Sequence, residues 1–250
     1  MVLPLTRKSF ICISLLLLSF NCFAFIHHLL PEKISYKSQF NNCPSNSAGK
    51  FVLKLTKIFD KEKSLYELKK EIKEKDLQKK YFISKYDISL EPISGRVTFK
   101  LTCPEALAKV TAFNEEGKSV LQATLVEGAK LYDPTYEVLL RGEKIIKAPL
   151  PVLAIPAKLL DEKIQQRVSL LVAKLDRLTR KYLSEIILNE NKELTVIFSY
   201  KGRPSSVFFG QNDWEEKNSK LIKMFNYMHQ NSKMPKIVNM TNIKKVVVKF

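Results

Sequence analysis

The sequence predicts an α+β protein with a single N-terminal transmembrane helix, a small β-α-β-β unit and a larger mixed α/β unit. Three observations predict it: an apolar stretch without formal charge from Phe10 to Leu30, runs that alternate apolar and polar residues, and apolar stripes at helical spacing between those runs. With 250 residues and a 45% apolar share, the chain is long enough for more than one core.

The N-terminus predicts export of the bulk of the chain. Residues 1–9 form a short tail with Arg7 and Lys8, and residues 10–30 are long enough to cross roughly 30 Å of hydrocarbon as a helix. The two basic residues would hold the tail in the cytoplasm and send the remainder across. The alternative is a cleaved signal peptide, with Phe10–Phe20 as its apolar core and Cys22–Ala24 as the cleavage site.

The charge balance narrows the class of partner. The chain carries a formal charge of +17, and without Arg7 and Lys8 it keeps 40 basic against 25 acidic residues. Such an excess is typical of proteins that bind nucleic acid, anionic membranes or acidic proteins. Because export disfavours nucleic acid, phospholipid headgroups or an acidic protein surface are expected instead. Lysines that only keep an exported domain soluble are the alternative.

Two of the four cysteines lie beyond the apolar segment. Cys12 and Cys22 lie within it, whereas Cys43 and Cys103 follow it. An oxidising compartment permits a Cys43–Cys103 disulfide. Two free thiols remain the alternative, since Cys43 stands in a linker-like stretch.

Residues 31–49 are polar and turn-rich and are expected to be a linker. Residues 50–110 are expected to form the small β-α-β-β unit. Its helix is predicted from Ser64, which is followed three residues later by Glu67 in a capping-box pattern. Its expected strands lie at Lys50–Phe59, Tyr81–Glu91 and Arg96–Thr102.

Residues 111–250 alternate strands with two helices. A hairpin is expected around residues 114–118, and Asp161 is expected to open one long helix whose stripe runs to Tyr182. Two strands flank Asn189–Asn191, the second with Leu194, Val196, Phe198 and Tyr200 on one face. A further strand over residues 205–210, a helix over Trp214–Met228 and two closing strands complete the unit.

The sequence lacks the common catalytic, nucleotide-binding and metal-binding motifs. The sequence contains no Gly-rich dinucleotide loop, no phosphate-binding Walker loop, no HExxH and no GxSxG motif. His229 has no second His or Cys near it in sequence, and metal-ligand spacing is absent. We therefore expect no enzyme: no catalytic or metal-binding residues, no cofactor, no small-molecule substrate and no nucleic-acid partner.

The final run predicts a binding surface. Val246, Val248 and Phe250 alternate with Lys245, Val247 and Lys249, which is the period of a strand, and Phe250 is expected to be its last inward-facing anchor. A strand added last to a sheet is an edge, where unpaired N–H and C=O groups invite a partner strand. Lysines that only protect the edge from pairing are the alternative. The predicted partner-binding residues are Lys244, Lys245, Val246, Val247, Val248, Lys249 and Phe250.

An ordered set of local motifs resembles the FtsQ/DivIB family of bacterial cell-division proteins. Leu125–Asp133 is similar to a "vD-x-x-G-x-vf" strand, and residues 207–225 resemble a "G-x(6)-Kl-x-x-l" passage with Gly210, Lys217 and Leu221 in place. The stretches "ISLEPISGRVTFKLTCPEALAKV", "APLPVL" and "KIVNMTNIKKVVVKF" resemble the end of the family's POTRA domain, its "lP-x-l" turn and its closing "iDLr-x-x-x-vvVrf". Asn239 and Thr241 depart from the last pattern.

The resemblance implies a POTRA domain over residues 50–110 and an FtsQ-type β domain over residues 111–250. It implies a non-enzymatic divisome scaffold of the inner membrane, single-pass and type II, with its bulk in the periplasm. The POTRA domain would serve recruitment during septation, and the edge at Lys244–Phe250 would bind FtsB-like and FtsL-like proteins. Another exported POTRA-type protein of envelope biogenesis or secretion is the alternative.

Overall fold

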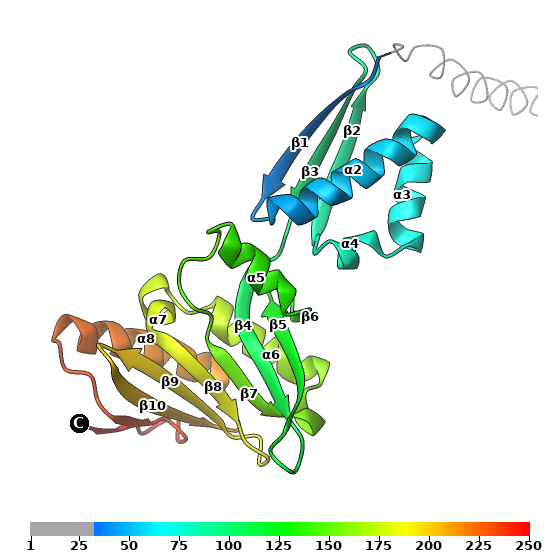
Figure 1. Ribbon diagram of the computed structural model, residues 1–250. Helices are drawn as coiled ribbons and strands as arrows, with labels where there is room; N and C mark the ends of the chain where they lie inside the picture. The colour runs from blue at the N-terminus through cyan, green and yellow to red at the C-terminus, as the bar shows by residue number, and fades with distance from the viewer. Residues whose placement is uncertain (1–32) are drawn as a thin grey trace, which may run out of the picture. The chain divides into compact units, whose positions relative to one another are not determined.

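The structure is a computed structural model that describes residues 33–250, and within them the chain forms two compact units. The first unit ends at Cys103 and the second is Pro104–Phe250. The first therefore ends before the expected boundary at residue 110. Figure 1 shows one small sheet with helices in the first unit and a larger sheet with helices in the second.

The first unit contains three strands and three helices. Its sheet has the order β1-β3-β2, in which β1 runs parallel and β2 antiparallel to β3. Val97, Phe99 and Leu101 of the central strand are buried under the helices. The elements are β1 (Ser35–Asn41), α2 (Ser45–Glu62), α3 (Leu65–Glu74), α4 (Leu77–Lys80), β2 (Lys85–Glu91) and β3 (Arg96–Thr102).

The predicted strand at Lys50–Phe59 is wrong, because these residues lie in helix α2. Phe51, Leu55 and Phe59 fit both an alternating run and a helical stripe, so the apolar pattern alone did not separate the two. Leu53 decides between them. A strand would bury it, yet it is 63% exposed. The helix instead buries Ala48, Phe51, Val52, Leu55 and Phe59.

The predicted linker is also corrected. Residues 35–41 of the expected 31–49 tether form the edge strand β1, and α2 already begins at Ser45. The topology of the unit is therefore strand, three helices and two strands, instead of β-α-β-β. One of the two hydrogen bonds of the predicted capping box is confirmed, since the Ser64 hydroxyl accepts from the backbone N–H of Glu67.

A disulfide joins Cys43 to Cys103. Cys43 lies just before α2 and Cys103 just after β3, and both side chains are buried. The Cys103 N–H also donates to the Asn41 carbonyl oxygen at 3.1 Å, which continues the β1–β3 pairing up to the disulfide. The disulfide thus joins the two ends of a loop of the chain, because the two cysteines are 60 residues apart in sequence.

The predicted fold class is corrected with respect to the membrane. No helix within residues 33–250 is long and apolar enough to cross a bilayer, so the structure gives no support to the expected transmembrane helix. That expectation, like the tail at residues 1–9 and the cleavage site at Cys22–Ala24, lies outside the described residues.

The second unit is built on one mixed sheet. Its nine strands have the order β12-β11-β10-β9-β8-β7-β4-β5-β6. The strands are β4 (Ala106–Phe113), β5 (Ser119–Val126), β6 (Lys130–Tyr132), β7 (Val152–Pro156), β8 (Leu183–Leu188), β9 (Leu194–Tyr200), β10 (Arg203–Gly210), β11 (Ile237–Asn239) and β12 (Val247–Lys249). The helices are α5 (Thr135–Gly142), the short 3-10 helix η1 (Ala157–Leu159), α6 (Glu162–Ala173), α7 (Arg177–Tyr182) and α8 (Trp214–Gln230).

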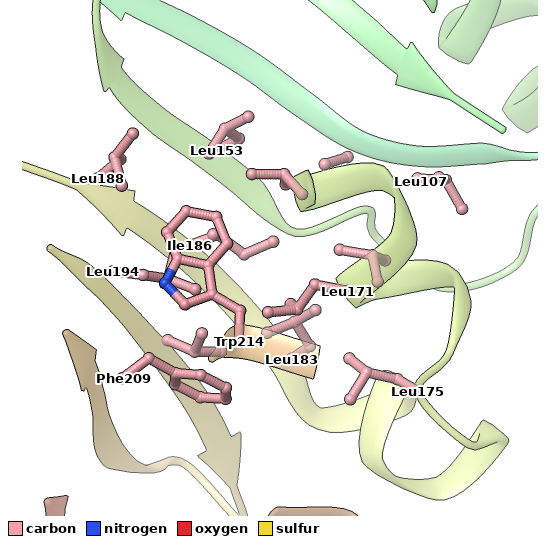
Figure 2. Close-up of a cluster of buried hydrophobic side chains, with 14 of the residues drawn as sticks. Leu107, Leu153, Leu171, Leu175, Leu183, Ile186, Leu188, Leu194, Phe209 and Trp214 are labelled. Atoms are coloured by element: carbon pink, nitrogen blue, oxygen red, sulfur yellow. The ribbon is translucent and has the colours of Figure 1, made fainter. Parts of the chain in front are cut away.

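The core of this unit lies between one face of the sheet and helices α6 and α8 (Figure 1). Figure 2 shows Trp214 surrounded by leucine and isoleucine side chains and by Phe209. The alternation predicted for residues 194–200 is confirmed, since Leu194, Val196, Phe198 and Tyr200 are all buried. The expected hairpin is confirmed by the antiparallel pairing of β4 with β5.

Two parts of the second unit differ from the prediction. The long helix expected from Asp161 is broken into α6 and α7, because the Asp176 carboxylate accepts from the Thr179 N–H at 2.8 Å and starts a new helix. Helix α5 was not predicted. It packs through Tyr136, which is fully buried and donates its hydroxyl proton to the Pro104 carbonyl oxygen at 2.6 Å.

Replacing both cysteines, Cys43→Ser with Cys103→Ser, is expected to destabilise the first unit by about 2–4 kcal/mol, because the unfolded chain is no longer constrained by a closed loop. Thermal unfolding with and without dithiothreitol measures this. The reductant should lower the melting temperature of the parent protein and leave that of the double variant unchanged. Equal effects of the reductant on both proteins would contradict the prediction.

Candidate functional site

Strand β12 lies at one edge of the nine-stranded sheet, as the sequence predicted for the end of the chain. It pairs only with β11, antiparallel, with Val248 opposite Val238. β11 in turn runs parallel to β10. The edge is shorter than expected. Of the predicted Lys244–Phe250, only Val247–Lys249 are strand; Lys244 lies in the preceding turn, and Lys245, Val246 and Phe250 have no regular structure. Within residues 33–250, its outward N–H and C=O groups have no neighbouring strand.

The two faces of the edge differ in chemistry. Val248 is half-buried and lies on the side of the helices, because its partner Val238 belongs to the core. Val247 and Lys249 lie on the other side and are exposed, Val247 by 52%. The expectation that Phe250 anchors the strand inward is wrong, since its side chain is 64% exposed. Apolar surface is therefore available beside the edge at Val246, Val247 and Phe250.

The turn between β11 and β12 is held by side-chain hydrogen bonds of its own. The Asn239 Oδ1 accepts from the N–H of Thr241 at 3.0 Å and from its hydroxyl at 2.7 Å. The Asn242 Oδ1 accepts from the N–H of Lys244 at 2.9 Å. Asparagine is favoured at such positions because its side chain imitates a backbone turn. The residues that depart from the family pattern therefore fix the approach to the edge strand.

Lys217 of helix α8 ties this turn to the body of the unit. Its ammonium group donates to the carbonyl oxygens of Phe209 at 2.7 Å, Asn212 at 2.8 Å and Thr241 at 3.1 Å. The residue is only 2% exposed. All three N–H bonds of the ammonium are thus used, which is what a buried charge without a paired carboxylate requires. We name Lys217 and these three carbonyl oxygens the carbonyl cage.

Burial lowers the pKa of Lys217, and the nearby Asp213 carboxylate opposes this effect. A second lysine acts on the same turn from the surface, since Lys220 Nζ donates to the Ile243 carbonyl oxygen at 2.9 Å. The Lys220 side chain is 43% exposed and also pairs with Glu216. Helix α8 therefore holds the turn at two points, one buried and one exposed.

Gly210 ends β10 beside the turn between β11 and β12. Its φ of +70° favours glycine, and Thr241 Cγ2 lies at ordinary van der Waals distance, 3.4 Å, from where a Cβ would stand. Its carbonyl oxygen accepts from Trp214 Nε1 at 2.9 Å. Gly210 and Lys217 of the sequence motif therefore both lie beside Thr241, and Lys217 binds its carbonyl oxygen.

The start of α8 is also fixed to α6. The Arg167 guanidinium lies 3.6 Å from the centre of the Trp214 ring, and Lys174 pairs with Glu215. Asn218, buried under α6, donates to the Leu171 carbonyl oxygen at 3.0 Å. The helix that carries the carbonyl cage is therefore itself held in place.

The sequence located the edge but missed the residues that support it. Lys217 was noted only as a motif position, and no role followed from it. His229 lies within an aromatic cluster with Tyr182 and Tyr200. In residues 33–250, no group of three or more His, Cys, Asp or Glu side chains is arranged to hold a metal ion.

Comparison with known proteins identifies no relative: no family model matches the chain, and no curated protein is significantly similar to it. Function is therefore inferred from the geometry of the β12 edge and from the sequence motifs that resemble FtsQ/DivIB.

Replacing Lys217 by methionine is expected to lower the free energy of unfolding by about 2–4 kcal/mol, because three carbonyl oxygens lose a charged donor. Hydrogen exchange should quicken most at β11, β12 and the turn between them. Chemical denaturation combined with mass-spectrometric hydrogen exchange measures both effects.

Lys220→Met is the matched control, since it removes an exposed lysine that holds the same turn through one carbonyl oxygen. Its expected cost is below about 1 kcal/mol. If the two variants lost the same stability, the carbonyl cage would not be the main support of the turn.

Proposed function

We propose that this chain is a non-enzymatic scaffold of bacterial cell division that holds its partners by accepting a strand along β12. The observation that carries the proposal is the edge itself. β12 offers unpaired backbone groups, Lys249 and the exposed Val247 on a support that the carbonyl cage helps to fix. The ordered motifs that resemble FtsQ/DivIB support a place in septation, with FtsB-like and FtsL-like proteins as partners.

The geometry favours strand addition over helix docking. An added strand forms its hydrogen bonds with the backbone, which needs an open edge, whereas a helix needs an apolar groove. Only Val248 of β12 faces the core side, and it is half-buried. The bonds of the backbone would supply affinity, and the side chains next to Val247, Val248 and Lys249 would fix the register.

Charge adds a preference for acidic partners. Lys244, Lys245 and Lys249 are exposed, and none of them forms an ion pair within the described part of the chain. A partner strand that carries Asp or Glu opposite Lys249 and apolar residues opposite the valines would complement this edge.

The Cys43–Cys103 disulfide supports a location outside the cytoplasm, because the reducing conditions of the cytoplasm keep most thiols free. A periplasmic location agrees with a role in the division machinery of the envelope. The first unit, which corresponds to the POTRA-like region, would serve recruitment to the division site.

Deleting Lys244–Phe250 is expected to abolish co-purification with the host's FtsB-like protein and to give filamentous cells, because the partner strand loses its template. The test is replacement of the chromosomal copy, with cell length and pull-down as readouts. Normal division and intact capture would exclude β12 as the site. Loss of capture of the FtsB-like protein without filamentation would place the binding outside division.

Reversing charge without deleting the strand separates electrostatics from folding. Lys245→Glu with Lys249→Glu is expected to weaken partner binding at least tenfold at low salt, and the difference should shrink as salt screens the charges. Lys163→Glu with Lys223→Glu makes the same change in charge on exposed helical positions of the same unit. Equal weakening by both pairs would mean that only the net charge matters.

A further inference from the structure

We propose that helix α2 of the first unit docks onto an anionic phospholipid surface through one exposed face. This face, which we call the α2 lysine face, consists of Lys50, Leu53, Lys57 and Lys61. It lies on a different unit from the β12 edge, so the inference does not depend on the proposed function.

The face follows from the burial of the helix. Ala48, Phe51, Leu55 and Phe59 point into the core of the unit. The residues of the α2 lysine face recur at three- and four-residue spacing on the opposite side, and Leu53 is 63% exposed in their midst. No other part of this unit within residues 33–103 covers the Leu53 side chain.

The charge of this face is only partly neutralised locally. Helix α2 contains four lysines against two acidic residues, Asp60 and Glu62. Neither Lys50 nor Lys57 forms an ion pair in the described chain, and Lys61 pairs only with its exposed neighbour Glu62. The unit as a whole, residues 33–103, carries 16 basic against eight acidic residues. The field around the helix is therefore positive and attracts an anionic surface.

The type of basic residue favours lipid over protein. All 11 basic residues between Ser45 and Lys80 are lysines, and none is arginine. Protein interfaces are enriched in arginine and depleted in lysine, because the guanidinium group binds carboxylates in a fixed geometry. Lysines around an exposed leucine instead suit a headgroup layer, where flexible stems lie along apolar surface while the charges reach phosphate.

The test is lysine footprinting of the full chain in the presence of vesicles. Because residues 10–30 are themselves apolar, binding to any bilayer is uninformative, and the readout must be local. Acetylation of Lys50, Lys57 and Lys61 is expected to slow at least threefold with mixed phosphatidylcholine–phosphatidylglycerol vesicles. Pure phosphatidylcholine vesicles, or raised salt, should restore the rate.

Lys37 and Lys100 provide the internal control. They are exposed on the opposite face of the same unit, on β1 and β3, and their acetylation should not change. With Lys50→Gln and Lys57→Gln together, the protection of Lys61 by the anionic vesicles should be lost, whereas Lys37→Gln with Lys100→Gln should leave it unchanged.

The proposal would be overturned by equal protection of Lys37 and Lys100, by protection with pure phosphatidylcholine, or by an equal loss of Lys61 protection in both double variants. Protection by poly-glutamate without protection by anionic vesicles would also overturn it, and would assign the face to an acidic protein.

Discussion

The edge of the large sheet depends on one buried ammonium group. Lys217 has no carboxylate as its direct partner, and its charge is compensated by three carbonyl oxygens, two from the end of β10 and its connection to α8 and one from the turn before β12. A hydrophobic side chain at this position could pack, but it would remove the donor from all three oxygens, of which that of Phe209 is buried. Since Thr241 belongs to the turn that leads into β12, Lys217 helps to fix the outermost strand, together with Lys220 and the pairing of β12 with β11. A surface suited to binding is thus set by an interaction that no partner would touch.

The two basic surfaces of the molecule differ in what they would recognise. At β12 the backbone supplies direction and register, and the lysines Lys244, Lys245 and Lys249 add only a preference for charge. On α2 the backbone is fully used inside the helix, so only side chains remain to make contact. Recognition there would be insensitive to sequence and would fall with ionic strength. The overall positive charge of the chain therefore need not have a single cause.

The second unit could be predicted best where a strand buries one face, as β9 does. Leu194, Val196, Phe198 and Tyr200 alternate without ambiguity, and Asp161 marks a helix start. The first unit was harder to predict, because Phe51, Leu55 and Phe59 fit the period of a strand as well as that of a helix. Only the exposure of Leu53 distinguishes the two. The carbonyl cage could not be predicted at all. Its acceptors are backbone oxygens, which every residue carries, so the sequence shows the donor Lys217 but not what it binds. The roles of Gly210 and Lys217 follow from the structure, in which Thr241 lies beside both residues.

The disulfide also changes how the chain would carry tension. Cys43 follows the first strand and Cys103 is the last residue of the first unit, so the covalent path between residue 33 and the second unit bypasses the 60-residue interval. Force applied along the chain would pass through β1 and the sulfur atoms and would leave the helices, β2 and β3 unloaded. The parallel β1–β3 pairs would carry little of it, because β3 lies within the bypassed interval. The small unit would then act as a mechanical link of nearly fixed length.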